Sequence, residues 1–73
     1  MNVSQLLGVM LNVDMFQLRD RNYPDEILYE DTTVVRKVRN NWVLSLPVDY
    51  FGIADADTII FYVDGTFFEE DIF

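Results

Sequence analysis

Neither cysteine nor histidine occurs among the 73 residues of the sequence. Their absence excludes disulfides, thiolate or imidazole zinc sites, cysteine nucleophiles and every histidine-dependent catalytic triad. Lysine and arginine are scarce as well: five of them stand against thirteen aspartates and glutamates, which gives a formal net charge of −8. A chain this acidic is not expected to coat nucleic acid, because contacts to phosphate groups need lysine and arginine.

Long hydrophobic runs are also missing. The longest uninterrupted apolar stretch is far below the roughly 20 residues that a membrane-spanning helix needs. The N-terminal segment MNVSQLLGVMLNVD has no basic region and no small-residue cleavage site of the secretory type. We therefore expect a soluble, cytoplasmic protein that makes no contact with a membrane.

Apolar residues, by contrast, are plentiful and make up 51% of the sequence. This fraction is too high for a disordered chain. The length predicts one domain, but a single core of roughly 70–80 residues without disulfides or metal is close to the limit of stability. We therefore expect the chain to complete its core by self-association.

Near the N-terminus, the apolar residues recur at helical spacing, and Ser4 is suited to the N-cap position. These apolar residues are Val3, Leu6, Leu7, Met10 and Leu11. The pattern predicts a helix over residues 4–12. Beyond residue 12 we favour a continuation of the helix through Leu18, with a strand over Val13–Leu18 as the alternative.

The polar segment RDRNYPDE at residues 19–26 is predicted to be a loop. Pro24 restricts Tyr23 to extended geometry, and Asn22 and Asp25 are residues that favour turns. Its mixed charges are those of a solvated segment. Together with the helix, this loop predicts an N-terminal extension over residues 1–31.

Short β-type runs follow one another after the extension. Thr32–Val38 is rich in β-branched residues and predicts a strand, with a turn at Asn40 and Asn41. Trp42–Leu46 predicts the next strand, which Pro47 ends because proline cannot donate a ladder hydrogen bond.

The remaining residues predict a second hairpin. Val48–Phe51 is expected to form a short helical turn or loop, and Thr58–Val63 is a strongly apolar strand. Asp64 and Gly65 give the strongest hairpin signal in the chain, so that Thr66–Ile72 is expected to return as a strand. Residues 32–73 are thus predicted to be a β domain of two hairpins joined by one helical turn.

This β domain resembles the AbrB/MazE superfamily, the swapped-hairpin barrels of bacterial transition-state regulators and of antitoxins. Three pieces match in order: residues 35–38 before a polar turn, the step Leu46-Pro47, and the run Gly52-Ile53-Ala54 followed by Tyr62-Val63-Asp64. The match covers about residues 32–73. It implies a mainly β fold, in which a homodimer interlaces its hairpins into one barrel and carries an N-terminal helical extension.

The same resemblance implies a DNA-binding transcriptional regulator of the MazE type, an antitoxin or autorepressor that binds an operator and a toxin. The residues carried over to the DNA contact are Arg36, Lys37 and Arg39 with Asn40 and Asn41 of the turn. A two-fold dimer would double this basic cluster. The alternative for these cations is an ordinary solvated strand edge, where lysine prevents edge-to-edge pairing.

Partner contacts are expected at both ends of the chain. Leu6, Leu7, Met10 and Leu11 would pack on the barrel or on a partner, and the acidic run Glu69, Glu70 and Asp71 would imitate phosphates. This acidic run suggests a second hypothesis, an inhibitor of the phage type that blocks a nucleic-acid-binding enzyme such as a nuclease or CRISPR effector. The simpler interpretation is that the acidic residues keep an apolar protein soluble. A protein-interaction module without DNA binding is the third possibility.

The sequence contains no recognisable set of catalytic residues. The carboxylates Asp55 and Asp57 form no calcium loop, and no histidine is available as a general base. The glycines form no phosphate-binding motif. We therefore expect a protein that is not an enzyme and that uses no metal, cofactor or small-molecule substrate.

Overall fold

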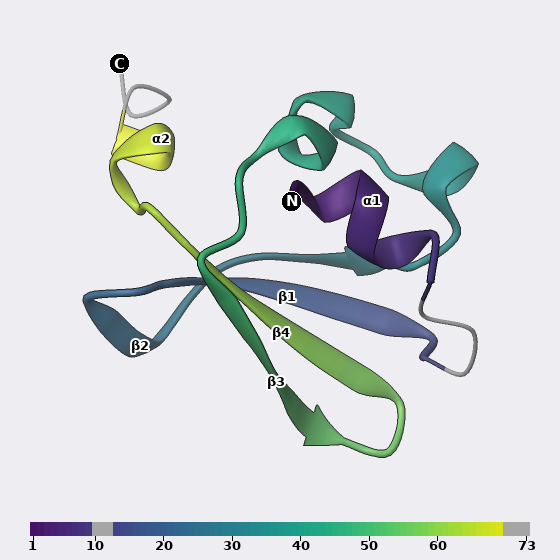
Figure 1. Cartoon of the computed structure of the whole chain (residues 1–73), viewed down its shortest axis with the longest axis horizontal. Coiled ribbons are helices and arrows are strands. Elements are labelled where there is room, and N and C mark those ends of the chain that lie inside the picture. The colour runs from purple at the N-terminus through teal and green to yellow at the C-terminus, as the bar shows by residue number, and fades with distance from the viewer. Residues whose placement is uncertain (10–12, 70–73) are drawn as a thin grey trace.

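The computed structural model describes residues 1–9 and 13–69, which form a four-stranded sheet with a few short helices (Figure 1). The elements in chain order are α1 (Val3–Leu7), β1 (Met15–Asp20), β2 (Tyr23–Thr32), the 3-10 helices η1 (Val35–Lys37) and η2 (Asn41–Ser45), β3 (Tyr50–Asp55), β4 (Thr58–Val63) and α2 (Thr66–Glu69). The predicted mainly β class is confirmed.

The strand order in the sheet is β2-β1-β4-β3. The two central strands, β1 and β4, run parallel, whereas each outer strand is antiparallel to its neighbour. A parallel pair needs a long crossover connection. Here that connection includes η1 and η2, which lie with α1 on one side of the sheet (Figure 1). Strands from both sides of residue 32 therefore pair in one sheet.

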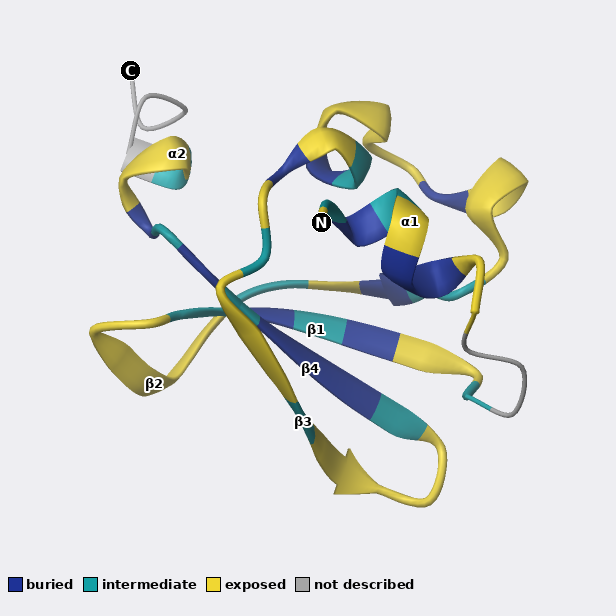
Figure 2. Cartoon of the chain, viewed as in Figure 1, coloured by how far each residue is buried: buried dark blue, intermediate teal, exposed yellow. Residues whose placement is uncertain are grey.

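The hydrophobic core lies between the sheet and the layer formed by α1 and η2. Side chains alternate along a strand, and the register places Phe16 opposite Ile59 and Leu18 opposite Phe61, so these four side chains share one face. The residues that cover this face are Val3, Leu6, Leu7, Val38, Val43 and Leu46. Figure 2 shows the buried positions of α1, β1 and β4 in dark blue.

Helix α1 confirms that a helix begins near the N-terminus, although its bounds differ from the prediction. Asn2, not Ser4, is the N-cap: its Oδ1 accepts a hydrogen bond from the Gln5 amide at 2.8 Å, and Gln5 Oε1 accepts one from the Asn2 amide at 2.9 Å. This reciprocal pair is a capping box. The helix ends at Leu7, while the predicted positions Met10 and Leu11 lie outside the described residues.

For the next segment, the strand alternative is confirmed, whereas the favoured helix and the predicted loop over residues 19–26 are wrong. β1 reaches Asp20, a two-residue turn follows, and Tyr23 already begins β2. Pro24 is tolerated because β2 is an outer strand, where one backbone face needs no ladder donor. The turn-forming residues therefore indicated a much shorter connection than predicted.

The strands predicted at Thr32–Val38 and Trp42–Leu46 are wrong, since these segments form η1 and η2. Val38, Val43 and Leu46 are buried in the core, and their spacing does not follow the alternation of a strand. These three side chains pack the connection between β2 and β3, residues 33–49, here called the crossover, against α1 and the sheet. Tertiary packing has thus overridden the local β-propensity.

Thr58–Val63 is confirmed as a strand, and its hairpin partner is β3. Of the return strand predicted at Thr66–Ile72, residues 66–69 form α2 instead, and residues 70–72 lie outside the described residues. Of the helical turn or loop expected at Val48–Phe51, residues 48 and 49 form a loop, whereas Tyr50 and Phe51 already belong to β3. After β4 the chain enters α2, since Asp64 Oδ1 accepts hydrogen bonds from the Thr66 amide at 3.0 Å and from Thr66 Oγ1 at 2.7 Å. Asp64 thus acts as a helix cap.

In the described part of the chain, no helix has the length and apolar character that crossing a membrane would require.

Candidate protein-binding surface

The basic residues singled out in the sequence do not form one surface. Arg36 and Lys37 are exposed in η1, and neither makes an ion pair with any residue that the structure describes. Asn40 and Asn41 are exposed at the start of η2. Arg39 is turned away from this group towards β2, so that two of the three predicted cations remain free for an external ligand.

Arg39 fastens the crossover to the outer edge of β2. Its Nε lies 3.5 Å from Asp31 Oδ2, and its Nη2 donates to the Glu30 carbonyl at 3.0 Å. The guanidinium carbon lies 5.8 Å from the centre of the Tyr29 ring, within cation–π range. These contacts hold the Arg39 charge against a carboxylate of its own chain.

Asp31 is the only buried charged side chain among the described residues, with 8% of its surface exposed. It accepts hydrogen bonds from the Tyr29 hydroxyl, from the Thr32 amide at 2.8 Å and from the Arg39 amide at 3.0 Å. Burial raises the pKa of Asp31, but these donors outweigh it and hold the pKa below its ordinary value. The Tyr29 pKa is raised, by burial first and then by this hydrogen bond.

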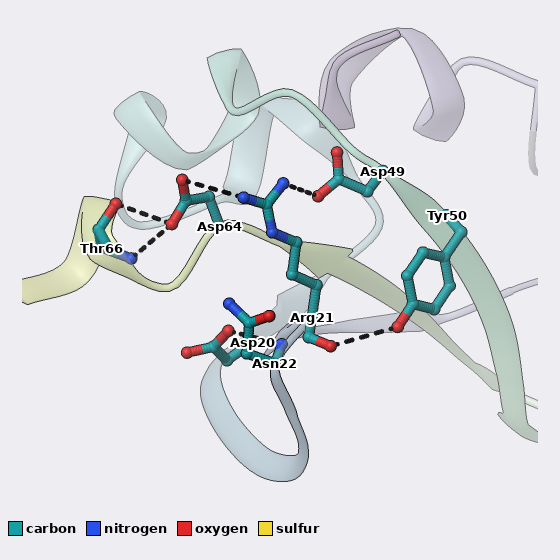
Figure 3. Close-up of polar contacts among 7 residues, drawn as sticks. All are labelled: Asp20, Arg21, Asn22, Asp49, Tyr50, Asp64 and Thr66. Carbon is teal, nitrogen blue, oxygen red and sulfur yellow. Dashed lines mark hydrogen bonds and ion pairs between the residues drawn. The ribbon is translucent and has the colours of Figure 1, made fainter.

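Arg21 is a second internally neutralised cation, at the opposite end of β1 (Figure 3). Its Nη1 lies 2.7 Å from Asp49 Oδ2 and its Nη2 lies 3.6 Å from Asp64 Oδ2. The Tyr50 hydroxyl donates to the Arg21 carbonyl at 3.4 Å. All three charged groups are partly exposed, so these pairs contribute little stability. These two carboxylates nevertheless neutralise the charge of Arg21 within the chain.

Arg19 is the third cation with intramolecular partners. Its Nε and Nη2 donate to Gln17 Oε1 at 3.1 and 2.8 Å, and its Nη1 donates to the Pro24 carbonyl at 3.1 Å. Many carboxylates have no such cationic partner among the described residues. These are Asp14, Asp20, Asp25, Glu26, Glu30, Asp55 and Asp57. The accessible charge of the chain is therefore predominantly negative.

The outer strand β3 exposes large apolar side chains to solvent. Tyr50 is 50% exposed, Phe51 51% and Ile53 64%, and Figure 2 shows most of this strand in yellow. The Tyr50 ring stacks on Tyr62 of β4 with ring centres 4.5 Å apart. Between Asp49 and Asp55 the strand carries no charge and no proline. Such an edge lacks the residues with which soluble proteins prevent strand pairing.

Beside β3 lies a shallow pocket of about 380 Å³. Its lining residues are Met1, Leu6, Val48, Asp49, Tyr50 and Phe51. Another pocket, of about 410 Å³, is lined by the consecutive residues 22–26 at the turn into β2. The pocket at β3 joins different elements and adjoins the exposed apolar strand, so it extends that apolar surface towards α1.

The partner-binding residues predicted from the sequence are placed differently. Leu6 and Leu7 belong to the core, with 8% and 5% of their surfaces exposed, so they are packed against the sheet of their own chain. Glu69 ends α2, whereas Glu70 and Asp71 lie outside the described residues, like Met10 and Leu11 of the N-terminal set. β3 was missed, because its first residues, Tyr50 and Phe51, were assigned to a helical turn or loop over Val48–Phe51.

Within the described ranges, no cluster of three or more acidic residues is arranged to hold a metal ion. Comparison with protein-family models, with curated proteins and with solved structures gives no match. The charge distribution and the exposed apolar strand β3 are therefore the features of this molecule that point to a function.

Proposed function

We propose that the protein is a small acidic protein-binding module that occupies a basic surface of its partner, as an inhibitor of a nucleic-acid-binding enzyme would. The observation that carries this proposal is the placement of charge. Two of the five cations, Arg21 and Arg39, are paired with carboxylates, and Arg19 is held by the neutral Gln17 side chain and the Pro24 carbonyl, in a chain of net charge −8. The resulting field attracts a basic protein and repels nucleic acid.

Acidic side chains gather where β1 begins and the β3–β4 turn lies. The amides of Asp14 and Met15 both donate to the Asp57 carbonyl, at 2.9 and 3.0 Å. Asp14 therefore lies beside Asp57, and Asp55 ends the adjoining β3. These three acidic residues lie next to an exposed apolar strand. Protein interfaces commonly combine an apolar centre with a polar rim in this way.

The test is salt-dependent binding to the basic protein that co-purifies with the chain at low salt. We expect its purified form to bind the chain more weakly as salt rises, and DNA to compete for the same surface. The variant Asp55→Asn/Asp57→Asn should associate about three- to tenfold more slowly, since rim charges act on association. The matched control Asp25→Asn/Glu26→Gln changes the net charge equally and should have less effect. Salt-independent binding, or binding that DNA leaves intact, would contradict the proposal.

A second candidate is the DNA-binding regulator that the family resemblance implies, with a swapped-hairpin homodimer as its active form. It is favoured by the exposure of Arg36 and Lys37 side by side in η1. In a dimer with interlaced hairpins, residues 32–46 would have to form strands in place of the 3-10 helices η1 and η2. A gel shift with a salt series and the variant Arg36→Ala/Lys37→Ala tests the DNA contact, while light scattering measures whether the chain is dimeric. A shift that the variant retains would remove this candidate.

A further inference from the structure

The two outer strands of the sheet differ in how their free backbone edges are protected. β2 carries Pro24, Asp25 and Glu26, all exposed, and Arg39 donates to its Glu30 carbonyl. Its pairing with β1 also shifts register twice, between Leu18 and Asp20. Proline, charge and irregularity are the usual means of blocking an edge.

β3 carries neither proline nor charge along residues 50–54, and its register shift with β4 lies at the end of this stretch, between Ile53 and Asp55. Its register with β4 is regular from Tyr50 to Ile53. Among the described residues, no backbone or side-chain donor outside the sheet bonds to the Tyr50–Ala54 backbone. The outward backbone groups of β3 are therefore free to bond to an added strand.

We propose that β3 takes up an extended segment of the partner as a fifth strand, and that this segment is apolar in its middle and carries lysine or arginine at both ends. The inference rests on the proposed function, which supplies the basic partner. Tyr50–Ala54 would span about 17 Å at roughly 3.3 Å per residue. Asp49 and Asp55 flank this stretch. Asp55 has no cationic partner among the described residues and would face a basic residue of the added segment, whereas Asp49 is already paired with Arg21 at 2.7 Å and would share its charge between Arg21 and the second basic residue.

The side chains of β3 determine which residues the added segment should carry. Phe51 lies opposite Phe61 and Ile53 opposite Ile59, so both exposed side chains share the face of the core. On this face the pocket with Leu6 and Val48 continues from Phe51. Apolar side chains at two alternate positions of the added strand would pack on Phe51 and Ile53.

A second copy of the chain suits this edge less well. In an antiparallel pair of β3 strands centred on Gly52, Asp49 would lie opposite Asp55 of the copy at both ends. Arg21 offsets part of the Asp49 charge, so the repulsion comes mainly from Asp55 and from the net charge of −8 on each chain. Charge complementarity therefore favours a basic segment over a copy.

The experiment uses the whole chain labelled with ¹⁵N and the probe peptide Lys-Thr-Val-Thr-Val-Thr-Lys. Antiparallel pairing places the two valines opposite Phe51 and Ile53 and the two lysines opposite Asp49 and Asp55. We expect amide shifts confined to residues 49–55 and slowed hydrogen exchange in β3. The same peptide with glutamate in place of both lysines should bind about tenfold more weakly or worse.

Two variants with the same charge change separate the edges. Ile53→Lys should weaken binding of the lysine peptide about tenfold or more, whereas Ile27→Lys, at a 51% exposed site in β2, should leave the affinity within about twofold. Both sites are exposed, so both variants should fold, which circular dichroism checks.

Three results would overturn the strand addition. They are peptide shifts outside β3, equal binding of the glutamate peptide, and β3 shifts that grow with protein concentration without peptide, which would assign the edge to a second copy. If the basic protein partner still binds the Ile53→Lys variant with full affinity and salt dependence, strand addition fails while the proposed function stands. If the peptide binds β3 but no basic protein binds the chain, the proposed function fails instead.

Discussion

Replacing Asp31 by alanine removes the acceptor that joins β2 to the crossover. The carboxylate accepts from the Tyr29 hydroxyl, the Thr32 amide and the Arg39 amide, and it lies 3.5 Å from the Arg39 guanidinium. Hydrogen bonds to a charged group contribute about 1.5–3 kcal/mol each, and water can reach the exposed Arg39 but less readily the half-buried Tyr29. We expect Asp31→Ala to lower the free energy of unfolding by about 2–4 kcal/mol.

That loss is large for so small a domain, whose total stability is roughly 4–11 kcal/mol at the usual value per residue. The corresponding fall in melting temperature is roughly 10–30 °C. Thermal and urea unfolding followed by circular dichroism measure it, with Asp25→Ala, an exposed carboxylate of the same strand, as the matched control. If the two variants lose equal stability, Asp31 does not hold the crossover in place.

Acid should weaken the same contact. The native pKa of Asp31 lies below its ordinary value, so its contribution is complete above the unfolded pKa of about 3.9 and is lost as the pH falls through the native pKa. The variant Asp31→Asn should therefore lose less stability than the wild type over this acidic range. Urea midpoints measured as a function of pH give the comparison, and parallel curves would contradict it.

Four further substitutions test the core and the turns by urea unfolding. Phe61→Ala removes a fully buried ring and should cost about 3–5 kcal/mol; a loss under 1 kcal/mol would contradict the packing. Gly65→Ala would place its Cβ against the Asp20 carboxylate, which is held by the Asn22 amide, and should cost about 1–3 kcal/mol, whereas Gly52→Ala, with its nearest neighbour at 3.7 Å, should be tolerated. Asp64→Ala removes the cap of α2 and should cost about 1 kcal/mol. Equal stabilities of the two glycine variants, or an unchanged Asp64→Ala, would refute the respective arguments.

Elements with a consistent local pattern were predictable from the sequence. Thr58–Val63 is strongly apolar and rich in residues that favour strands. It forms the central strand β4 with the predicted bounds. The helical spacing of Val3, Leu6 and Leu7 likewise predicted α1 and its buried side. In both cases, local propensity and tertiary packing favour the same structure.

The crossover was not predictable, because its conformation depends on distant contacts. Val38 and Val43 favour strands locally, yet each is buried against α1 and the sheet from a 3-10 segment or its flank. The candidate site shows the same limit. The clustering of Arg36, Lys37 and Arg39 is a property of the sequence, but the buried carboxylate that binds Arg39 belongs to β2. Which cations remain free is decided only when strands far apart in the sequence meet.

One pair of titrations of the ¹⁵N-labelled chain can show whether the chain binds a basic segment at β3 and whether it binds DNA. The lysine-flanked peptide is added to one sample and a short DNA duplex to the other. We expect amide shifts in residues 49–55 with the peptide and none with the duplex. Shifts at Arg36 and Lys37 on adding DNA, with β3 unchanged by the peptide, would contradict this expectation.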